Sequence, residues 1–358
     1  MKKTRKIKIG GRTVGQDEPL YFIADIASNH DGDLNRAYKL IELAKESGAD
    51  AAKFQNFQTS KIVSKKGFEA MAGMLSHQKK WKKSVYEIYC DASIPMDWTP
   101  KLRARCDEVG IEYFTSAYDF DSVNFVDPFV NVYKIGSGDI TWIKMIEFIA
   151  KKGKPVFLAT GASNMDDVVH AMDLLESITE DIVLMQCNTN YTGSQDNYKY
   201  LNLNVLKTYA RRFPEAILGL SDHTPGHSSI LGAIALGARV IEKHFTDDNA
   251  RTGPDHAFAI NPATWKEMVS KAHELDYSLG DGIKRIEENE KETALIQRRA
   301  LRTTKDLLKG HIIRLEDVYP LRPYINNSIA PYNIHKLIGR KIKRNISSDE
   351  LIHWEDVE

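Results

Sequence analysis

The sequence predicts an α/β protein in which a (β/α)8 barrel is followed by a small C-terminal domain. Short buried strands alternate with amphipathic helices eight times within about 280 residues, the size expected of such a barrel. The chain has 358 residues, more than the roughly 250 to 300 at which a single core stops growing. No G-x-G-x-x-G motif follows the first strand, which argues against a dinucleotide-binding fold. A doubly wound open sheet of eight strands is the structural alternative.

Two patterns decide the type of each element. Residues 20–26 form a short continuous apolar run, as in a buried strand, whereas Leu40, Ile41 and Ala44 recur on one helical face of residues 34–47. The same patterns then alternate, with a long polar connection after the second strand. Further strands are predicted at residues 51–54, 111–114, 130–135, 155–158, 182–186, 216–220 and 239–241. Further helices are predicted at residues 99–109, 121–127, 142–152, 164–177, 200–211, 227–237 and 262–278.

Composition excludes several classes of function. Lys plus Arg and Asp plus Glu both number 49, so there is no net field to recruit nucleic acid or an anionic membrane. The basic start, residues 1–6, is not followed by an apolar segment of a signal peptide, and no run reaches the roughly 18 to 20 apolar residues that span a bilayer. Cys90, Cys106 and Cys187 form no C-x-x-C pair and fit a reducing compartment. We therefore expect a soluble, cytoplasmic protein.

Every predicted strand ends in a polar or ionisable group. In a barrel, the loops after the strands converge on one mouth, where the chemistry takes place. Singly, Lys53 and Lys134 could be solvated loop lysines and Asp25 a turn cap, but a converging set of acids, bases and imidazoles indicates an enzyme. In chain order these groups are Asp25, Lys53, Gln55, Thr115, Ser116, Lys134, Ser137, Asp139, Thr160, Thr189, Tyr191, Asp222, His223, Glu242 and His244.

The two histidines of this set suggest a divalent metal. His223 and His244 close strands that are about twenty residues apart, which leaves room for one helix between two neighbouring parallel strands. A single His at a strand end is more often a satisfied polar residue than a ligand. Two imidazoles at the same end of one sheet, flanked by Asp222 and Glu242, favour a metal site.

The remaining groups suit a small ligand that carries both a phosphate and a carboxylate. Lys53 and Lys134 supply positive charge, and Ser116, Ser137, Thr160 and Ser221 supply hydroxyl donors. The glycines around Ser137 let backbone N–H groups approach an anion. A metal could polarise a carbonyl, while the carboxylates Asp25, Asp139 and Glu242 are available for proton transfer or for orienting hydroxyls. A phosphorylated carboxylic acid that reacts with an aldehyde is the pairing that these groups favour.

Six separated segments carry a family resemblance. They are FIADIASNHDGD at residues 22–33, AAKFQ at 51–55, YKIGSGD at 133–139, LSDHT at 220–224, VIEKHFT at 240–246 and GPDH at 253–256. In this order they resemble the sialic acid synthases, that is, the N-acetylneuraminate or nonulosonic acid synthase family, over nearly the whole chain. Residues 306–313 and 337–342 resemble the small antifreeze-like (SAF, β-clip) domain of these enzymes. The expected organisation is a TIM-barrel synthase domain at 1–284, a linker at 285–297 and the SAF domain at 298–358.

The resemblance implies a transferase that condenses phosphoenolpyruvate with an open-chain N-acylmannosamine-type sugar, giving a nine-carbon 2-keto acid and phosphate. It implies a divalent ion on His223 and His244, typically Mn2+, with Mg2+ or Co2+ as alternatives, that polarises the sugar aldehyde. Asp25, Glu242 and Asp139 would be catalytic, with Asp25 acting on the attacking water. The substrates would be held by Lys53, Gln55, Ser116, Lys134, Ser137, Thr160, Thr189, Tyr191, Ser221 and Asp255, and by Arg322 of a partner chain in a domain-swapped homodimer.

The chain departs from the family pattern in three places. Asp25 stands where the family commonly has Glu, and the stretch His-Cys-x-Ser-x-Tyr-Pro reads QCNTNYT at residues 186–192. The motif Arg-Pro-Gly-x-Gly-Ile reads RPYINNSI at residues 322–329, so both glycines, which allow close backbone approach, are replaced. We therefore predict a changed sugar pocket, suited to a modified or deoxygenated relative of N-acetylmannosamine.

Two other classes of function stay open from the sequence. One is another phosphoenolpyruvate-dependent 2-keto-3-deoxy sugar acid synthase, which would require a shorter, phosphorylated sugar. The other is a non-catalytic relative that binds the sugar or an anion, which the Asp25 substitution supports. A metal-dependent hydrolase is disfavoured, because no His-x-His follows the first strand and the paired lysines would have no role.

Overall fold

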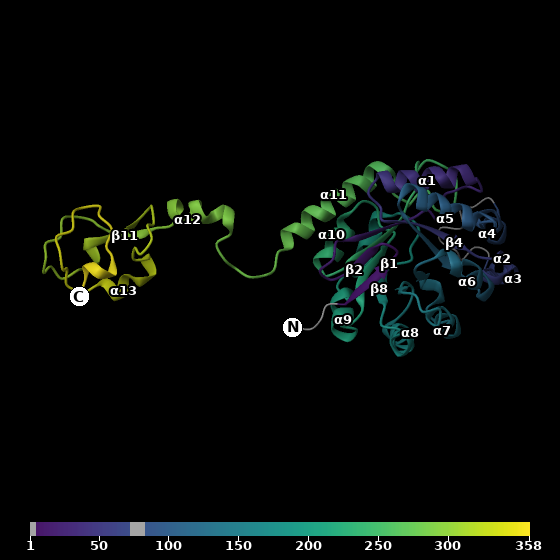
Figure 1. Ribbon diagram of the computed structural model, residues 1–358, viewed down its shortest axis with the longest axis horizontal. Coiled ribbons are helices and arrows are strands. Elements are labelled where there is room, and N and C mark those ends of the chain that lie inside the picture. Colours follow the sequence, from purple (N-terminus) through teal and green to yellow (C-terminus); the bar gives the residue numbers. More distant parts are fainter. Residues whose placement is uncertain (1–4, 72–82) are drawn as a thin grey trace. The chain divides into compact units, whose positions relative to one another are not determined.

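The structure, a computed structural model, describes residues 5–71 and 83–358. The chain divides into two compact units, Met1–Gly280 and Asp281–Glu358 (Figure 1). Part of the long connection after the second barrel strand lies outside the described residues. Within the described part of the chain, no helix combines the length and the apolar character that a bilayer span requires.

The first unit is a closed barrel of parallel strands, which confirms the predicted fold and excludes the open sheet. The strands pair in chain order, and β10 pairs with β3 to close the ring, with His244 opposite Asp25. The barrel strands are β3 (Tyr21–Asp25), β4 (Ala51–Asn56), β5 (Glu112–Ala117), β6 (Tyr133–Ile135), β7 (Val156–Ala159), β8 (Ile182–Cys187), β9 (Ile217–Asp222) and β10 (Val240–His244).

Helices between the strands cover the outside of the barrel. Several begin at a side-chain cap: Asp33 accepts hydrogen bonds from the N–H groups of Asn35 and Arg36, and Asn164 and Asn261 cap two later helices in the same way. The covering helices are α1 (Leu34–Glu46), α5 (Trp98–Val109), α6 (Phe120–Val126), α7 (Ile143–Ala150), α8 (Met165–Ile178), α9 (Val205–Arg212), α10 (Ser228–Ala235) and α11 (Pro262–Leu279).

The structure contains elements that the sequence did not predict. An antiparallel hairpin of β1 (Lys6–Ile9) and β2 (Arg12–Gly15) packs Ile7, Ile9 and Val14 against residues at the starts of the barrel strands. The described part of the connection between β4 and α5 contains three helices, namely α2 (Thr59–Ile62), α3 (Lys65–Ala70) and α4 (Val85–Ala92). Short 3-10 helices lie at η2 (Asp127–Phe129), η3 (Ser137–Asp139) and η4 (Gln195–Tyr200).

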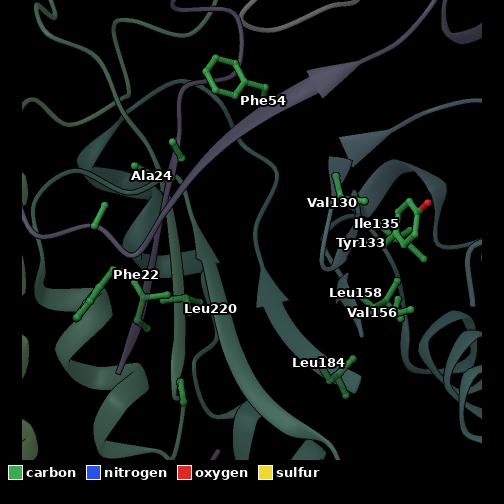
Figure 2. Packing of buried hydrophobic residues seen from close by; sticks show 14 of the residues in the cluster. Phe22, Ala24, Phe54, Val130, Tyr133, Ile135, Val156, Leu158, Leu184 and Leu220 are labelled. Carbon is green, nitrogen blue, oxygen red and sulfur yellow. The ribbon is translucent and has the colours of Figure 1, made fainter. Parts of the chain in front are cut away.

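Alternation along the strands separates two apolar layers. In β3, Phe22 and Ala24 face the helices and belong to the outer core shown in Figure 2, whereas Tyr21 and Ile23 belong to the core inside the barrel. Because successive strand side chains point to opposite faces, Asp25 continues the inward-facing set at the carboxyl end of the strand. The same alternation in the other strands decides which of the predicted groups face the mouth.

The second unit is a small domain with its own core. It pairs β11 (Ala300–Thr303) with β12 (Val318–Leu321) and contains α12 (Lys291–Gln297) and α13 (Ile334–Leu337). Its 3-10 helices are η5 (Glu288–Glu290), η6 (Leu315–Asp317), η7 (Pro331–Asn333) and η8 (Trp354–Asp356). The predicted linker at residues 285–297 lies within this unit and is partly helical, because η5 and α12 occupy most of it. The core consists of Leu301, Leu307, Ile313, Val318, Ile329, Leu337, Ile342, Ile346, Ile352 and Val357.

Candidate active site

Four charged side chains meet inside the barrel at the carboxyl ends of β3, β4, β6 and β10. Asp25, Lys53, Lys134 and Glu242 are all buried, with 2 to 4% of each residue exposed. Buried charges are costly unless they are paired, and here each one is. Lys53 Nζ donates to Asp25 Oδ2 at 2.5 Å, and Lys134 Nζ lies 3.4 Å from Glu242 Oε1. The structure thus brings together two lysines and two of the three predicted catalytic carboxylates.

Glu242 connects the two lysines. Its Oε1 accepts a hydrogen bond from Ser221 Oγ at 3.0 Å and lies 3.8 Å from Lys53 Nζ. Burial alone would raise the pKa of Glu242, but Lys134 and Lys53 outweigh it and lower the pKa. Within the described part of the chain, Glu242 Oε2 and Ser116 Oγ are buried without a hydrogen-bond partner. Unsatisfied buried polar atoms at the end of a barrel strand are groups that a ligand can satisfy.

The loop after β6 forms one wall of the mouth. Ser137 Oγ accepts a hydrogen bond from the Gly161 N–H at 2.9 Å. A Cβ at Gly161 would lie 2.5 Å from Thr189 Cγ2 and 2.9 Å from Ser137 Oγ, so only glycine fits between the two side chains. Burial raises the pKa of Asp139 to about 6, although Lys134 opposes the shift. Asp139 can therefore gain or lose a proton near neutral pH.

The two predicted metal ligands are neighbours. The rings of His223 and His244 have their centroids 5.3 Å apart, and the Tyr191 ring contacts both. His223 Nδ1 lies 2.8 Å from the carbonyl oxygen of Asn188; if Nδ1 donates there, its Nε2 lone pair is left for a ligand. Burial and the neighbouring His244 lower the pKa of His223, which keeps the imidazole neutral, as metal binding requires.

These imidazoles fit a metal that takes its remaining ligands from substrate or water. His244 Nε2 lies 3.6 Å from Asp25 Oδ2, and His244 Nδ1 is buried without a hydrogen bond. Among residues 5–71 and 83–358, no group of three or more His, Cys, Asp or Glu side chains is arranged to hold a metal. The protein therefore offers two imidazole donors and leaves the other coordination positions to substrate or water.

A cavity of about 380 Å3 opens at this mouth, and its lining is part polar and part apolar. A volume of that order suits a small molecule. The polar part of the lining consists of Ser28, Gln55, Ser137, Asp139, His244 and Asp255. The apolar and aromatic part includes Phe57, Ile62, Ile88, Tyr89, Ala92, Tyr118 and Tyr191.

Most of the apolar part of the lining comes from a segment to which the sequence reasoning assigned no role. Phe57 lies just before α2, Ile62 is the last residue of α2, and Tyr89 belongs to α4. All three lie in the connection that was predicted only as polar. The aromatic rings of Tyr89 and Tyr118 both contact Phe57. The signal in the sequence was the apolar face of residues 85–92, which a helical pattern search of that connection would have found.

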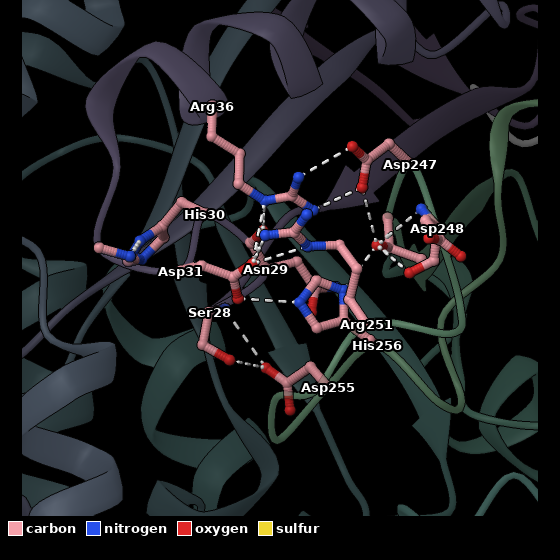
Figure 3. A network of polar contacts seen from close by, with 12 residues as sticks. Ser28, Asn29, His30, Asp31, Arg36, Asp247, Asp248, Arg251, Asp255 and His256 are labelled. Carbon is pink, nitrogen blue, oxygen red and sulfur yellow. Dashed lines mark hydrogen bonds and ion pairs between the residues drawn. The ribbon is translucent and has the colours of Figure 1, made fainter.

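Asp255 reaches the cavity from the loop after β10. Its Oδ2 accepts hydrogen bonds from Ser28 Oγ at 2.6 Å and from the Ser28 N–H at 3.3 Å. Around it, charged and polar residues of the loops after β3 and β10 form the network in Figure 3. Sequence reasoning named Asp255 but assigned no role to its hydrogen-bond partner Ser28 or to the adjacent His256.

Three predicted substrate-binding residues, Thr160, Thr189 and Arg322, are not among the residues that line the cavity. Thr160 Oγ1 donates to the carbonyl oxygen of Met185 and accepts from Tyr209 Oη, so it is engaged in the layer between the barrel and α9. Thr189 lies beside Gly161 behind Ser137. Arg322 belongs to the second unit, and its role stays a prediction.

The closed barrel, the buried lysine–carboxylate cluster and the paired imidazoles are the features of a (β/α)8 enzyme with its site at the carboxyl ends of the strands. Comparison with known proteins narrows this class. Residues 40–284 match the model of the NeuB family and residues 298–358 that of the SAF domain. The chain therefore belongs to the NeuB family. It is an enzyme, a phosphoenolpyruvate-dependent transferase that forms a carbon–carbon bond.

Individual relatives agree with this assignment over almost their full length. The chain is 33% identical to N,N'-diacetyllegionaminic acid synthase of Legionella pneumophila, covering 100% of both chains. It is 29% identical to human N-acetylneuraminate-9-phosphate synthase, covering 97% of this chain and 95% of that one. The crystal structure of N-acetylneuraminic acid synthetase from Leptospira borgpetersenii, in complex with citrate, matches with a TM-score of 0.70 and 26% identity, over 81% of this chain and 95% of that one.

Proposed function

We propose that this protein is a nonulosonic acid synthase that condenses phosphoenolpyruvate with an N-acylmannosamine-type six-carbon sugar. The products would be a nine-carbon 2-keto acid and phosphate. The observation that carries the proposal is the pair of buried lysines, Lys53 and Lys134, on β4 and β6. The carboxyl ends of the same two strands carry the cavity-lining residues Gln55, Ser137 and Asp139. The relatives named as legionaminic and neuraminate synthases support it.

Phosphoenolpyruvate would bind at the lysine end of the site. Lys53 and Lys134 supply charge, and Ser116, Ser137 and Ser221 supply hydroxyl donors to its phosphate and carboxylate. These donors are fixed by the barrel before the substrate arrives, so they can stabilise the negative charge that develops as phosphate departs. The partnerless Ser116 Oγ is an atom that a bound anion would satisfy.

The reaction balances without any redox partner. The methylene carbon of phosphoenolpyruvate bonds to the aldehyde carbon of the open-chain sugar, and the aldehyde oxygen takes a proton. Water adds at the carbon that carries phosphate, and the C–O bond to phosphate then breaks to leave the 2-keto group. Asp25, placed by Lys53, would orient or deprotonate this water, and the Asp139 carboxylate would accept a proton.

His223 and His244 would hold the divalent cation, with Mn2+ as the proposed ion and Mg2+ or Co2+ as alternatives. When bound, it would polarise the sugar aldehyde. Gln55, Tyr191, Glu242 and Asp255 would position the hydroxyl groups of the sugar. Thr160 and Thr189 would act indirectly, by supporting the loops that carry the contacting residues. We also propose a domain-swapped homodimer in which Arg322 reaches the N-acyl carbonyl bound to the partner.

The apolar residues of the cavity lining would favour some sugars over others. A hydroxyl held against Phe57, Ile62 and Ile88 would lose its hydrogen bonds to water without gaining others, which costs roughly 1 to 3 kcal/mol. A deoxygenated carbon or a second acyl group would gain from the same contact. We therefore propose a modified relative of N-acetylmannosamine as the preferred sugar.

A substrate panel tests the proposal. The metal-loaded protein is mixed with phosphoenolpyruvate and with N-acylated, di-N-acylated, deoxygenated and phosphorylated sugars, and phosphate release and product mass are measured. We expect metal-dependent release of phosphate with a product heavier by one pyruvyl unit, at the highest kcat/KM for a modified sugar. Lys134→Met should abolish it, whereas the exposed Lys266→Met should not. Silence across the panel with metal bound would contradict the synthase, and a preference for N-acetylmannosamine would contradict the proposed sugar.

A further inference from the structure

The loops that follow β3 and β10 are tied together across the closure of the barrel. These two strands are neighbours in the ring although they lie at opposite ends of the barrel sequence. The ties join side chains of the first loop, Ser28 to Asp31, to side chains of the second, Asp247 to His256 (Figure 3). Two of the joined residues, Ser28 and Asp255, line the cavity, whereas Asp31 and His256 do not.

His256 anchors the loop that follows β10. It is fully buried, with Nε2 2.9 Å from Asp31 Oδ1 and Nδ1 2.7 Å from Thr246 Oγ1, so both ring nitrogens are engaged. The chain also crosses the ring closely, because a Cβ at Gly253 would lie 2.6 Å from His256 Cδ2. Residues 253–256 are thus folded around the imidazole, and moving the ring would move the turn.

Asp31 anchors the loop that follows β3 in the same way. Besides His256, its Oδ2 accepts hydrogen bonds from Arg251 Nε at 2.9 Å and from Arg251 Nη2 at 2.7 Å, and it lies 3.2 Å from Arg36 Nε. Partial burial would raise the pKa of Asp31, but the hydrogen bonds from His256 and Arg251 keep it below the usual value. Arg36 in turn makes a bidentate pair with Asp247.

The second tie between the loops holds Asp255 itself. Both hydrogen bonds from Ser28 go to Asp255 Oδ2, and neither uses Oδ1. Ser28 lies three residues before Asp31, and Asp255 directly precedes His256. The Asp31–His256 contact therefore fixes the separation of the two backbones at the point where Asp255 must meet Ser28.

We propose that Asp31 and His256 are positioning residues that set the Asp255 carboxylate for the sugar. They do not line the cavity, and they act through the turn at residues 253–256. The inference rests on the proposed function in one respect, that Asp255 binds the sugar. A binding geometry that is off by about 1 Å can lower catalytic efficiency about a hundredfold, so a support of this kind controls specificity.

Two variants at Asp31 separate positioning from simple loss of structure. Asp31 has φ +52°, in the left-handed region, so Asp31→Gly removes the carboxylate without adding backbone strain. Asp31→Asn tolerates the same φ and keeps an oxygen that accepts from His256 Nε2. Asp33→Ala is the matched control, because Asp33 caps α1 in the same loop and has no contact with residues 247–256 among those described.

The experiment measures KM for the sugar, KM for phosphoenolpyruvate, kcat and Tm of each full-length variant. We expect Asp31→Gly and His256→Gln to raise the sugar KM at least tenfold, with the phosphoenolpyruvate KM within twofold of the unchanged protein. Asp31→Asn should recover most of the loss. Asp33→Ala should lower Tm and leave the sugar KM within twofold. Equal changes in both KM values, or no recovery in Asp31→Asn, would overturn the positioning role.

Asp255→Asn separates this inference from the proposed function. If that variant leaves the sugar KM unchanged, the proposed role of Asp255 is wrong. If it raises the sugar KM while Asp31→Gly does not, the sugar contact stands and only the positioning role of Asp31 and His256 is rejected.

Discussion

Replacement of Lys243 by Met is predicted to destabilise the barrel strongly. Lys243 and Asp222 face the layer between the barrel and α10, and their side chains are 1% and 0% exposed. Lys243 Nζ donates to Asp222 Oδ2 and to the carbonyl oxygen of Thr224, both at 2.5 Å. Removing one partner of a buried pair leaves the other charge uncompensated, which costs roughly 3 to 5 kcal/mol.

The surroundings of Asp222 place the expected loss near the lower end of that range. After Lys243→Met, the carboxylate keeps hydrogen bonds from Ser229 Oγ at 2.8 Å and from the Thr224 N–H at 3.1 Å. We expect the free energy of unfolding to fall by about 3 kcal/mol. In the double variant with Asp222→Asn, both charges are gone, and the cycle should show a coupling of about 2 kcal/mol.

Urea denaturation at neutral pH, with the slope m compared between variants, measures these free energies. The control is Lys151→Met, which removes an exposed pair between Glu147 of α7 and Lys151, the residue that follows this helix. It should change stability by less than about 0.5 kcal/mol. A loss below about 1 kcal/mol for Lys243→Met, at unchanged m, would refute the reasoning. Additive effects in the cycle would likewise show that the two side chains do not act as a pair.

Three further predictions concern the site. The pKa of Asp139 is raised to about 6 and its carboxylate is lost as pH falls through that value, so kcat/KM should decline below pH 6. In Asp139→Asn this decline at low pH should disappear. A pH profile of kcat/KM that is unchanged in the variant would contradict the role of Asp139. Gly161→Ala should raise the phosphoenolpyruvate KM at least fivefold, because the new Cβ would displace Ser137; a change confined to the sugar KM would show that Ser137 holds something else. Asp25→Asn should lower kcat about a hundredfold or more in protein that is still folded, which single-turnover measurement would check.

The barrel and the centre of its site followed from simple sequence rules. Parallel strands ending at one mouth bring Asp25, Lys53, Lys134 and Glu242 together whatever the details of the loops. The rule worked because the ends of the strands were predicted to within three residues. At Thr160 that was not sufficient, since a shift of one residue moves a strand side chain to the other face.

Other features depended on contacts that no local pattern contains. Asp31 and His256 lie 225 residues apart, and they meet because β10 pairs with β3. The apolar part of the cavity lining comes largely from helices in the connection between β4 and α5. The polar composition of that connection gave no indication of these helices. The β1–β2 hairpin, in contrast, has a visible signal in the alternation of Lys6 to Ile9 before two glycines, and a search for short hairpins would have predicted it.

The fate of the bridging oxygen tests the central claim most directly. Phosphoenolpyruvate that carries 18O at the oxygen bridging C2 and phosphorus is turned over with metal and the preferred sugar. The mass of the released phosphate is then measured by mass spectrometry. Water addition at C2 followed by C–O cleavage predicts phosphate that carries the label, in amounts equal to the product, and no phosphate without sugar. Unlabelled phosphate, or release that does not need the sugar, would mean attack at phosphorus and would contradict a condensing synthase.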